Sequence, residues 1–142
     1  MPTWKRDIRR FIALAEPKPG EKLYELGCGD ARLVVCAAKT CGVKGVGVEL
    51  SLVHVLAAWL RARLARSGVR IRLRNLFRVD LSQADIVYLF LMPEAYEKIR
   101  AKFERELKPG ARVVTYVWPI PGWEPVKVDR CEKAPELYLY VR

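Results

Sequence analysis

Length, composition and charge narrow the class of protein. The chain has 142 residues, of which 51% are hydrophobic and 30% charged, and its formal net charge is +10 at pH 7. This length suits one domain with a substantial core, and this composition excludes a disordered tail. The positive charge favours acidic partners but does not indicate a reaction type.

Two features of the sequence bear on cellular location. No apolar run is long enough to span a bilayer, and the longest, residues 86–93, suits a buried strand. The amino-terminal residues 1–7 contain no apolar signal core. We therefore expect a cytoplasmic protein without a membrane partner. Asn75 and Gln83 are the only residues of their types, and this scarcity of thermolabile amides indicates a thermophile.

The cysteines do not indicate a metal site. Their positions lack zinc-ligand spacing, and the chain has one histidine to help them, His54. We predict small core residues, no bound metal and a His54 that is packed or on the surface. A disulfide between Cys36 and Cys41 stays open as an alternative, although it would bridge one helix end. The four cysteines are Cys28, Cys36, Cys41 and Cys131.

The first half of the chain alternates helices and strands. Apolar residues at helical spacing predict a helix over residues 8–15, which Pro17 stops. Strands are expected at residues 22–26 and 44–49, with a helix over residues 30–40 between them. Ser51 is the expected N-cap of the next helix. That helix carries the apolar residues Leu52, Val55, Leu56, Trp59, Leu60 and Leu64.

The second half of the chain contains strands of two kinds. Residues 69–74 alternate apolar side chains with arginines, which predicts an edge strand with one open face. Residues 86–92 are apolar throughout, as in a central strand. Pro93 suits the first position of a helix whose apolar stripe is Tyr96, Ile99, Phe103 and Leu107. A fifth strand at 111–118 and two short β segments at 126–128 and 137–141 follow.

The order of these elements predicts the fold class. Strands alternate with helices four times before a terminal β pair, and no linker or repeat interrupts them. We expect a single domain over residues 1–142, of the α/β class. Its sheet is predicted to be doubly wound, mainly parallel and Rossmann-like, with about seven strands and a C-terminal antiparallel β pair.

A glycine-rich loop after the first strand predicts a nucleotide site. The segment Glu25-Leu26-Gly27-Cys28-Gly29 ends that strand, and Glu49 ends the next one, 20 positions beyond Gly29. Such glycines let the backbone approach a ligand closely, and the acid can accept hydrogen bonds from ribose hydroxyls. Arg32 stands where a dinucleotide fingerprint needs glycine or alanine, and the chain has no P-loop motif.

The loop and the acid resemble motif I of the class I S-adenosylmethionine-dependent methyltransferases. The resemblance extends over roughly residues 22–123. Segments Leu91-Met92-Pro93 and Pro121-Gly122-Trp123 are similar to those of the archaeal broad-specificity protein-lysine methyltransferases and their eukaryotic mitochondrial relatives. The resemblance implies the class I methyltransferase fold, S-adenosyl-L-methionine as cofactor and lysine-bearing proteins as substrates.

The resemblance also implies the cofactor-binding residues. The glycine loop would contact the methionine portion through its backbone, with an acid nearby, and the second acid would accept from the ribose. Residues after the third strand would line the adenine site. Asn75 replaces an acid often found there, and the segment before Gly20 is shorter than the entry segment that helps close the family's pocket. The implied residues are Glu25, Gly27, Cys28, Gly29, Glu49, Leu50, Asn75, Leu76 and Phe77.

Methyl transfer to lysine requires an apolar acceptor slot more than it requires an acid–base pair. The protein must align the nucleophile, exclude water and favour a neutral amine. We assign no catalytic residue. The helical spacing of Tyr96 favours a core role, whereas Trp123 could belong to the slot or to the core. The slot candidates are Leu91, Met92, Pro93, Tyr96, Trp118 and Trp123.

Other activities remain as alternatives. The fourth strand ends without the Asp/Asn-Pro-Pro-aromatic loop of nucleobase amino-methylation and without a cysteine for cytosine C5 chemistry. An arginine cluster favours RNA as the main rival acceptor or partner, although a charged face beside an edge strand is commoner and no interleaved aromatics suggest stacking on bases. A cofactor-binding protein without transfer activity is a third alternative. The cluster is Arg61, Arg63, Arg66, Arg70, Arg72, Arg74 and Arg78.

Overall fold

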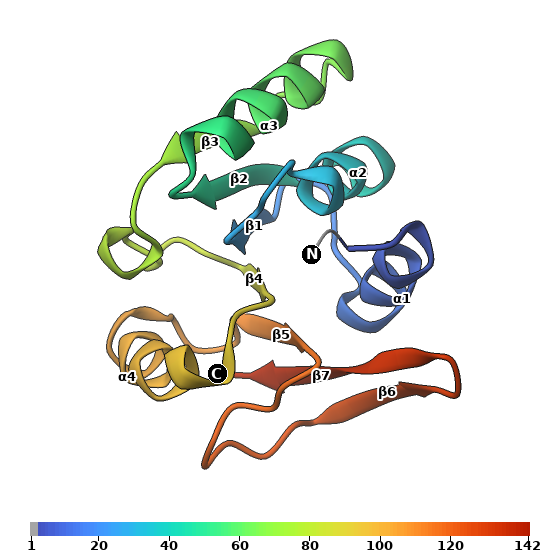
Figure 1. Ribbon diagram of the computed structural model, residues 1–142. Helices are drawn as coiled ribbons and strands as arrows, with labels where there is room; N and C mark the ends of the chain where they lie inside the picture. The colour runs from blue at the N-terminus through green and yellow to red at the C-terminus, as the bar shows by residue number, and fades with distance from the viewer. Residues whose placement is uncertain (1–2) are drawn as a thin grey trace.

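A computed structural model describes residues 3–142 (Figure 1). Residues 1 and 2, part of the segment used above to predict location, lie outside it. The strands are β1 (Lys22–Leu26), β2 (Lys44–Glu49), β3 (Arg70–Leu73), β4 (Ile86–Leu89), β5 (Arg112–Tyr116), β6 (Lys127–Cys131) and β7 (Ala134–Val141). The α-helices are α1 (Lys5–Ala15), α2 (Arg32–Cys41), α3 (Leu52–Leu64) and α4 (Tyr96–Glu106), and the 3-10 helices are η1 (Leu76–Arg78) and η2 (Pro93–Ala95).

The strands of residues 3–142 form one seven-stranded sheet in the order β3-β2-β1-β4-β5-β7-β6. The first five are parallel, whereas β7 runs antiparallel to both β5 and β6. This confirms the predicted α/β sheet with its C-terminal antiparallel pair. Both strands of that pair are longer than predicted, and in β6 the charged residues Asp129 and Arg130 obscure the apolar alternation.

Helices cover both faces of the sheet and bury two cores. Residues of α1, α2 and α3 pack on one face, and α4 packs on the other. The alternation within each strand distributes side chains between the two, so that Leu23 lies in the first core and Tyr24 in the second. All of β4 is buried, which confirms the prediction of a central strand.

Strand β3 lies at the edge of the sheet, as its alternating arginines predict. It pairs with β2, and Arg70 and Arg72 are exposed. Another prediction is corrected: Pro93 begins the short 3-10 helix η2, and the α-helix starts only at Tyr96. The predicted stripe of that helix, Tyr96, Ile99, Phe103 and Leu107, is nevertheless buried.

Helix α3 packs with its small residues. Ala58 and Ala62 are buried, whereas larger apolar residues such as Leu56 and Trp59 are exposed. Ser51 occupies the predicted N-cap position, but its side chain makes no capping hydrogen bond. None of the helices in residues 3–142 combines the length and apolar character that crossing a bilayer requires.

The four cysteines are free, so the alternative of a Cys36–Cys41 disulfide is not realised. Cys28 is buried, as predicted for a small core residue, and Cys36 and Cys41 are half-buried beside the first core. The prediction is wrong for Cys131, which is exposed at the end of β6. That strand forms the outer edge of the sheet, where a side chain is easily left in solvent.

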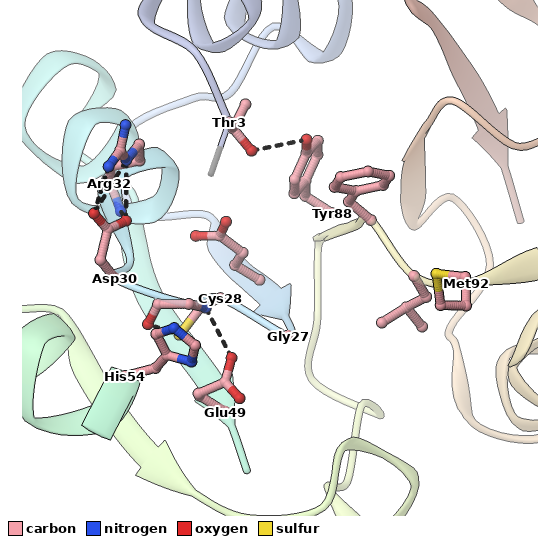
Figure 2. A pocket seen from close by; sticks show the side chains of 13 residues that line it. Thr3, Gly27, Cys28, Asp30, Arg32, Glu49, His54, Tyr88 and Met92 are labelled. Carbon is pink, nitrogen blue, oxygen red and sulfur yellow. Dashed lines mark hydrogen bonds and ion pairs between the residues drawn. The ribbon is translucent and has the colours of Figure 1, made fainter. Parts of the chain in front are cut away.

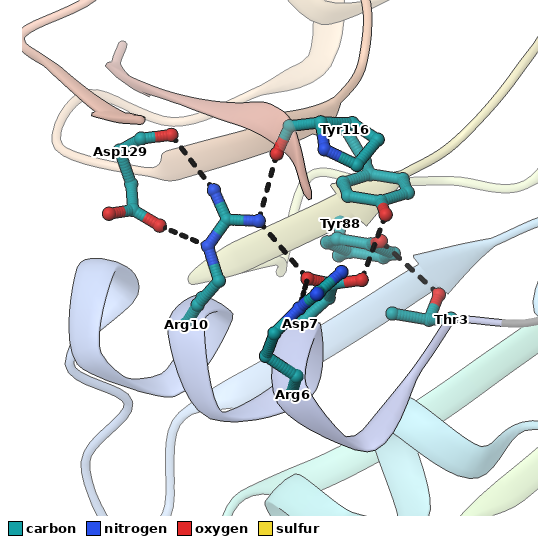
Figure 3. A network of polar contacts seen from close by, with 8 residues as sticks. Thr3, Arg6, Asp7, Arg10, Tyr88, Tyr116 and Asp129 are labelled. Carbon is teal, nitrogen blue, oxygen red and sulfur yellow. Dashed lines mark hydrogen bonds and ion pairs between the residues drawn. The ribbon is translucent and has the colours of Figure 1, made fainter. Parts of the chain in front are cut away.

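A buried ionic network holds α1 against the sheet (Figure 3). The carboxylate of Asp7 is fully buried and accepts hydrogen bonds from Arg6, Arg10 and the hydroxyl of Tyr116. Burial alone would raise the pKa of Asp7, but these hydrogen bonds outweigh it and the pKa is lowered. Arg10 also donates to Asp129 over 2.6 Å, so the network ties α1 to the β6–β7 hairpin.

Candidate active site

The main pocket of the described residues opens at the carboxyl ends of β1, β2 and β4 (Figure 2). Its volume is about 700 Å³. Open α/β sheets bind ligands in this crevice, beyond the carboxyl ends of their strands. The pocket is lined by Thr3, Glu25, Gly27, Cys28, Gly29, Asp30, Arg32, Glu49, His54, Tyr88, Phe90, Leu91 and Met92.

The glycine loop forms one side of the pocket and turns sharply out of β1. Gly27 and Gly29 have φ of 71° and 54°, a conformation that other residues adopt only with strain. The N–H groups of Gly27 and Cys28 both donate to the carbonyl oxygen of Val48, over 2.8 and 2.9 Å. A Cβ atom at Gly27 would lie 3.4 Å from the side chain of Leu91, so glycine keeps this part of the pocket open.

Glu49 at the end of β2 holds the loop in place. Its Oε2 accepts from the N–H of Gly29 over 2.9 Å, and its Oε1 accepts from the N–H groups of Leu50 and Ser51 over 2.8 and 3.0 Å. An ionised carboxylate offers about four acceptor positions. Three are used within the protein, and one on Oε2 is left for a ligand.

Glu25 lies buried beneath the loop, at the amino end of α2. Its Oε2 accepts from the N–H of Val34 over 3.0 Å and thereby caps that helix. Burial raises the pKa of Glu25 to about 8. The carboxyl group lines the pocket, where a cationic ligand would favour its ionised form.

Asp30 and two arginines close the outer end of the loop. Arg32 binds both carboxylate oxygens of Asp30, and Arg61 of α3 donates to Oδ2 over 2.9 Å. The hydrogen bonds from Arg32 lower the pKa of Asp30. Arg32, which stands where a dinucleotide fingerprint needs glycine or alanine, therefore has a role in this loop: it binds Asp30. We call Glu25, residues 27–29 and Glu49 the loop wall.

The opposite side of the pocket is apolar and comes from β4 and the segment after it. We call Tyr88, Phe90, Leu91 and Met92 the apolar wall. The hydroxyl of Tyr88 lies 3.3 Å from Oγ1 of Thr3, so the segment before α1 reaches the pocket (Figure 2). The ring of Phe90 packs edge-on against that of Tyr116, with the ring centroids 5.0 Å apart.

The structure divides the residues predicted to bind the cofactor. Glu25, residues 27–29 and Glu49 meet at the pocket, whereas Leu50 is exposed beside it. Asn75, Leu76 and Phe77 lie in and before η1, outside the residues that line the pocket. The N–H of Arg74 donates to the backbone oxygen of Glu49, so the chain enters η1 directly beside the end of β2.

The predicted acceptor slot is divided as well. Leu91 and Met92 line the pocket, and Pro93 follows them in η2. Tyr96 is fully buried in the second core, in agreement with its helical spacing. Trp123 packs against the rings of Phe103 and Tyr140, and Trp118 is exposed; neither lines the main pocket.

Sequence reasoning missed several residues that line the pocket. Tyr88 on β4 and Phe90 just after it precede the predicted Leu91-Met92-Pro93 segment, and this closeness in sequence could have indicated them. His54 is exposed, as predicted, but it also lines the pocket from α3. Thr3 carried no local signal, because only the folding of α1 onto the sheet brings it there.

Comparison with known proteins identifies the family. The sequence profile of the ANTKMT methyltransferase domain matches residues 25–127 of this chain. The chain belongs to this family. The protein-lysine N-methyltransferase of Saccharolobus islandicus (strain REY15A) is 38% identical over 149 residues, which cover 99% of this chain and 91% of that protein. The adenine nucleotide translocase lysine N-methyltransferase of Mus musculus is 36% identical, and the match covers 87% of this chain and 54% of the mouse protein.

Solved structures agree with the family on fold and cofactor. A crystal structure described as an RNA methyltransferase from Salinibacter ruber, in complex with S-adenosyl-L-homocysteine, has a TM-score of 0.96 and 34% identity. The match covers 99% of this chain and 93% of that one. An S-adenosylmethionine-dependent methyltransferase from Geobacter sulfurreducens has a TM-score of 0.72 and 20% identity, which shows the fold alone. The fold is that of the class I methyltransferases, and the cofactor is S-adenosylmethionine.

Proposed function

We propose that this chain transfers methyl groups from S-adenosylmethionine to lysine side-chain amines of proteins. The observation that carries the proposal is the contrast between the two sides of the pocket in a member of this family. The loop wall offers carboxylates and bare backbone for a polar cofactor, and the apolar wall suits an amine that must be neutral. The names of the archaeal and mouse relatives, both lysine N-methyltransferases, support the same acceptor.

The hydrogen-bond acceptors of the loop wall fit the cofactor. Glu25 has one oxygen beyond its bond to Val34, and this oxygen would receive the ammonium of the methionine portion. The N–H groups of residues 27–29 are already bonded within the protein, which leaves carbonyl oxygens and Cα atoms to contact the ligand. The open position on Oε2 of Glu49 would accept from a ribose hydroxyl, and Asn75, Leu76 and Phe77 would line the adenine.

The residues around the pocket suit a direct displacement by the acceptor amine. When bound, S-adenosylmethionine supplies a methyl group that its sulfonium already activates. Leu91 and Met92 would border the acceptor and disfavour its ammonium form, and Tyr88 and Phe90 would restrict water. Burial raises the pKa of the Cys28 thiol, so this cysteine stays protonated and is a poor nucleophile.

RNA is the less favoured acceptor. The description of the Salinibacter ruber protein and the arginines of α3 and β3 both point to it. However, the exposed ring of Trp59 on α3 has Arg63 placed 5.2 Å from its centroid. This ring already stacks against a cation of the protein, which disfavours its use as a platform for bases.

A labelling experiment tests the acceptor. The protein is incubated with tritiated S-adenosylmethionine and an extract that contains both protein and RNA, and each fraction is counted after nuclease or protease digestion. We expect label in protein and mass increments of one methyl group on lysines. A Glu49→Ala variant is the control for cofactor-dependent labelling. Label confined to RNA would reject the proposal, and absence of transfer despite cofactor binding would favour a binding protein.

We also propose a cytoplasmic location in a thermophile. Free thiols at Cys36 and Cys41 suit a reducing compartment, and the scarcity of Asn and Gln suits high temperature. Calorimetry of the purified protein tests the second part. A melting temperature above about 90 °C would support a heat-loving source, whereas one near 50 °C, within the usual range of mesophilic domains at about 45–65 °C, would contradict it.

A further inference from the structure

The outer face of α3 is a continuous apolar surface. Six large apolar side chains of this helix are each at least half exposed. At 100° per residue, they occupy a stripe about 140° wide along the whole length of the helix. We call this stripe the α3 outer face. It consists of Leu52, Val53, Leu56, Trp59, Leu60 and Leu64.

The orientation of α3 is held by contacts on its other side. Ala58 and Ala62 face the sheet and are buried. Arg61 donates through Nε to the backbone oxygen of Asp30 and through Nη2 to its carboxylate, over 3.0 and 2.9 Å. The helix therefore cannot rotate its leucines inward without losing these bonds, and small side chains are what the close packing on the sheet accepts.

The surroundings of this face are strongly positive. Between Leu50 and Val79 the sequence has seven arginines and no acidic residue. Three of them, Arg70, Arg72 and Arg74, are exposed on and just after the edge strand β3, which lies beside α3 (Figure 1). Within residues 3–142 these three form no salt bridge.

We propose that the α3 outer face and the β3 arginines dock on an anionic lipid surface. Helices that lie in the membrane interface combine leucine and tryptophan on one face with flanking arginines, which attract acidic headgroups. A second copy of the chain is a poor occupant, because the arginines of the two copies would oppose each other with no local acid. Nucleic acid would satisfy the arginines but would not cover leucines.

The cofactor pocket lies on the opposite side of α3 from the outer face. His54 lines the pocket, and at 100° per residue it lies about 150° around the helix from the middle of the outer face. The proposal departs from the sequence-based expectation of no membrane partner, which rested on the lack of a spanning segment. It concerns surface binding alone, and it stands or falls independently of methyl transfer.

Cosedimentation with vesicles tests the proposal. The intact protein is mixed with vesicles of phosphatidylcholine alone or of equal parts phosphatidylcholine and phosphatidylglycerol. We expect binding to the anionic vesicles, at least tenfold weaker binding to neutral ones, and weakening by salt. A triple variant, Leu56→Gln with Trp59→Gln and Leu60→Gln, should bind at least tenfold more weakly, and Arg72→Glu at least about fivefold more weakly.

Matched control variants test whether vesicle binding depends on this face and not on exposed apolar residues or positive charge in general. Val126→Gln with Val141→Gln changes exposed apolar residues far from α3 along the chain, and Arg9→Glu changes an exposed arginine of α1; both should bind vesicles as the parent does. Unchanged affinity for S-adenosylhomocysteine shows that each variant is folded.

Three results would overturn the proposal. The first is absence of binding to anionic vesicles. The second is a dimer, seen by analytical ultracentrifugation, that the triple variant dissociates, since the outer face would then be a self-association surface. The third is RNA oligonucleotide binding that Arg72→Glu abolishes while vesicle binding is equal in all variants.

Discussion

The two walls of the pocket are built in different ways. The loop wall is held by hydrogen bonds to its two carboxylates: the N–H of Gly29 donates to Glu49, and the N–H of Val34 in α2 donates to Glu25. The apolar wall ends in Met92, which is 71% exposed, and in the short helix η2. The side proposed to receive the cofactor is therefore preorganised, whereas the side that would face a variable acceptor carries few polar constraints.

This difference separates two kinds of specificity. Hydrogen bonds have fixed directions, so a wall made of them accepts one ligand and rejects its analogues. Apolar contacts discriminate weakly between acceptors of similar size. We therefore expect substitutions in the loop wall to alter cofactor affinity strongly, and substitutions in the apolar wall to alter turnover with modest effects on affinity.

The largest effect is expected from Glu49→Ala. The variant loses the proposed acceptor for ribose and also releases three backbone N–H groups that hold the loop. Hydrogen bonds to charged groups contribute about 1.5–3 kcal/mol each, so affinity for S-adenosylhomocysteine should fall at least about a hundredfold. Titration calorimetry measures it, with the exposed Glu132→Ala as control. Unchanged affinity would place the ribose elsewhere.

Glu25→Gln should change how stability depends on pH. The folded chain keeps a proton on Glu25 up to a pKa of about 8, whereas the unfolded chain loses it near 4.5. Between these values the unfolded state binds fewer protons, so stability falls as pH rises, by up to about 1.4 kcal/mol per pH unit. Denaturant unfolding from pH 5 to 8 should show this slope in the parent but not in the variant. Equal slopes in both proteins would contradict the buried, protonated carboxyl.

Gly27→Ala tests whether the loop contacts the cofactor, and Gly68→Ala is its matched control. The two glycines have φ of 71° and 70°, but a Cβ at Gly68 meets nothing within 4 Å, whereas one at Gly27 meets Leu91. Both variants should lose about 1–2 kcal/mol of stability to backbone strain. Only Gly27→Ala should bind S-adenosylhomocysteine more weakly, by roughly tenfold, which corresponds to about 1.4 kcal/mol of binding free energy. Similar binding by both variants would show that the loop does not contact the cofactor.

The smallest effects are expected in the apolar wall. Met92→Ser should reduce turnover on a lysine acceptor about tenfold and leave the affinity for S-adenosylhomocysteine unchanged, since about 1.5 kcal/mol of apolar contact is lost. Trp118→Ser, which changes an exposed residue outside the pocket, should leave both unchanged. Initial rates with tritiated cofactor measure the difference. An equal loss in the tryptophan variant would extend the acceptor slot beyond the pocket.

Local sequence patterns predicted much of the fold. The uninterrupted apolar run of β4 predicted a central strand, and the alternating arginines of β3 predicted an edge, because burial on two faces or on one leaves a direct mark on the sequence. The β6 strand was underestimated because Asp129 is charged. Its partner Arg10 lies 119 positions away, so no local pattern could explain it.

The sequence by itself indicated the loop wall: two glycines and two acids at fixed spacing predict a nucleotide cradle, because glycine accepts the turn after the first strand and the two acids end successive strands. Only the tertiary structure decided which side chains face the cradle and which leave it. It brought Thr3 and His54 to the pocket, packed Trp123 against the second core, and turned the large residues of α3 outward. Those outcomes depend on how helices pack on the sheet over long separations, and residue spacing within a helix does not record them.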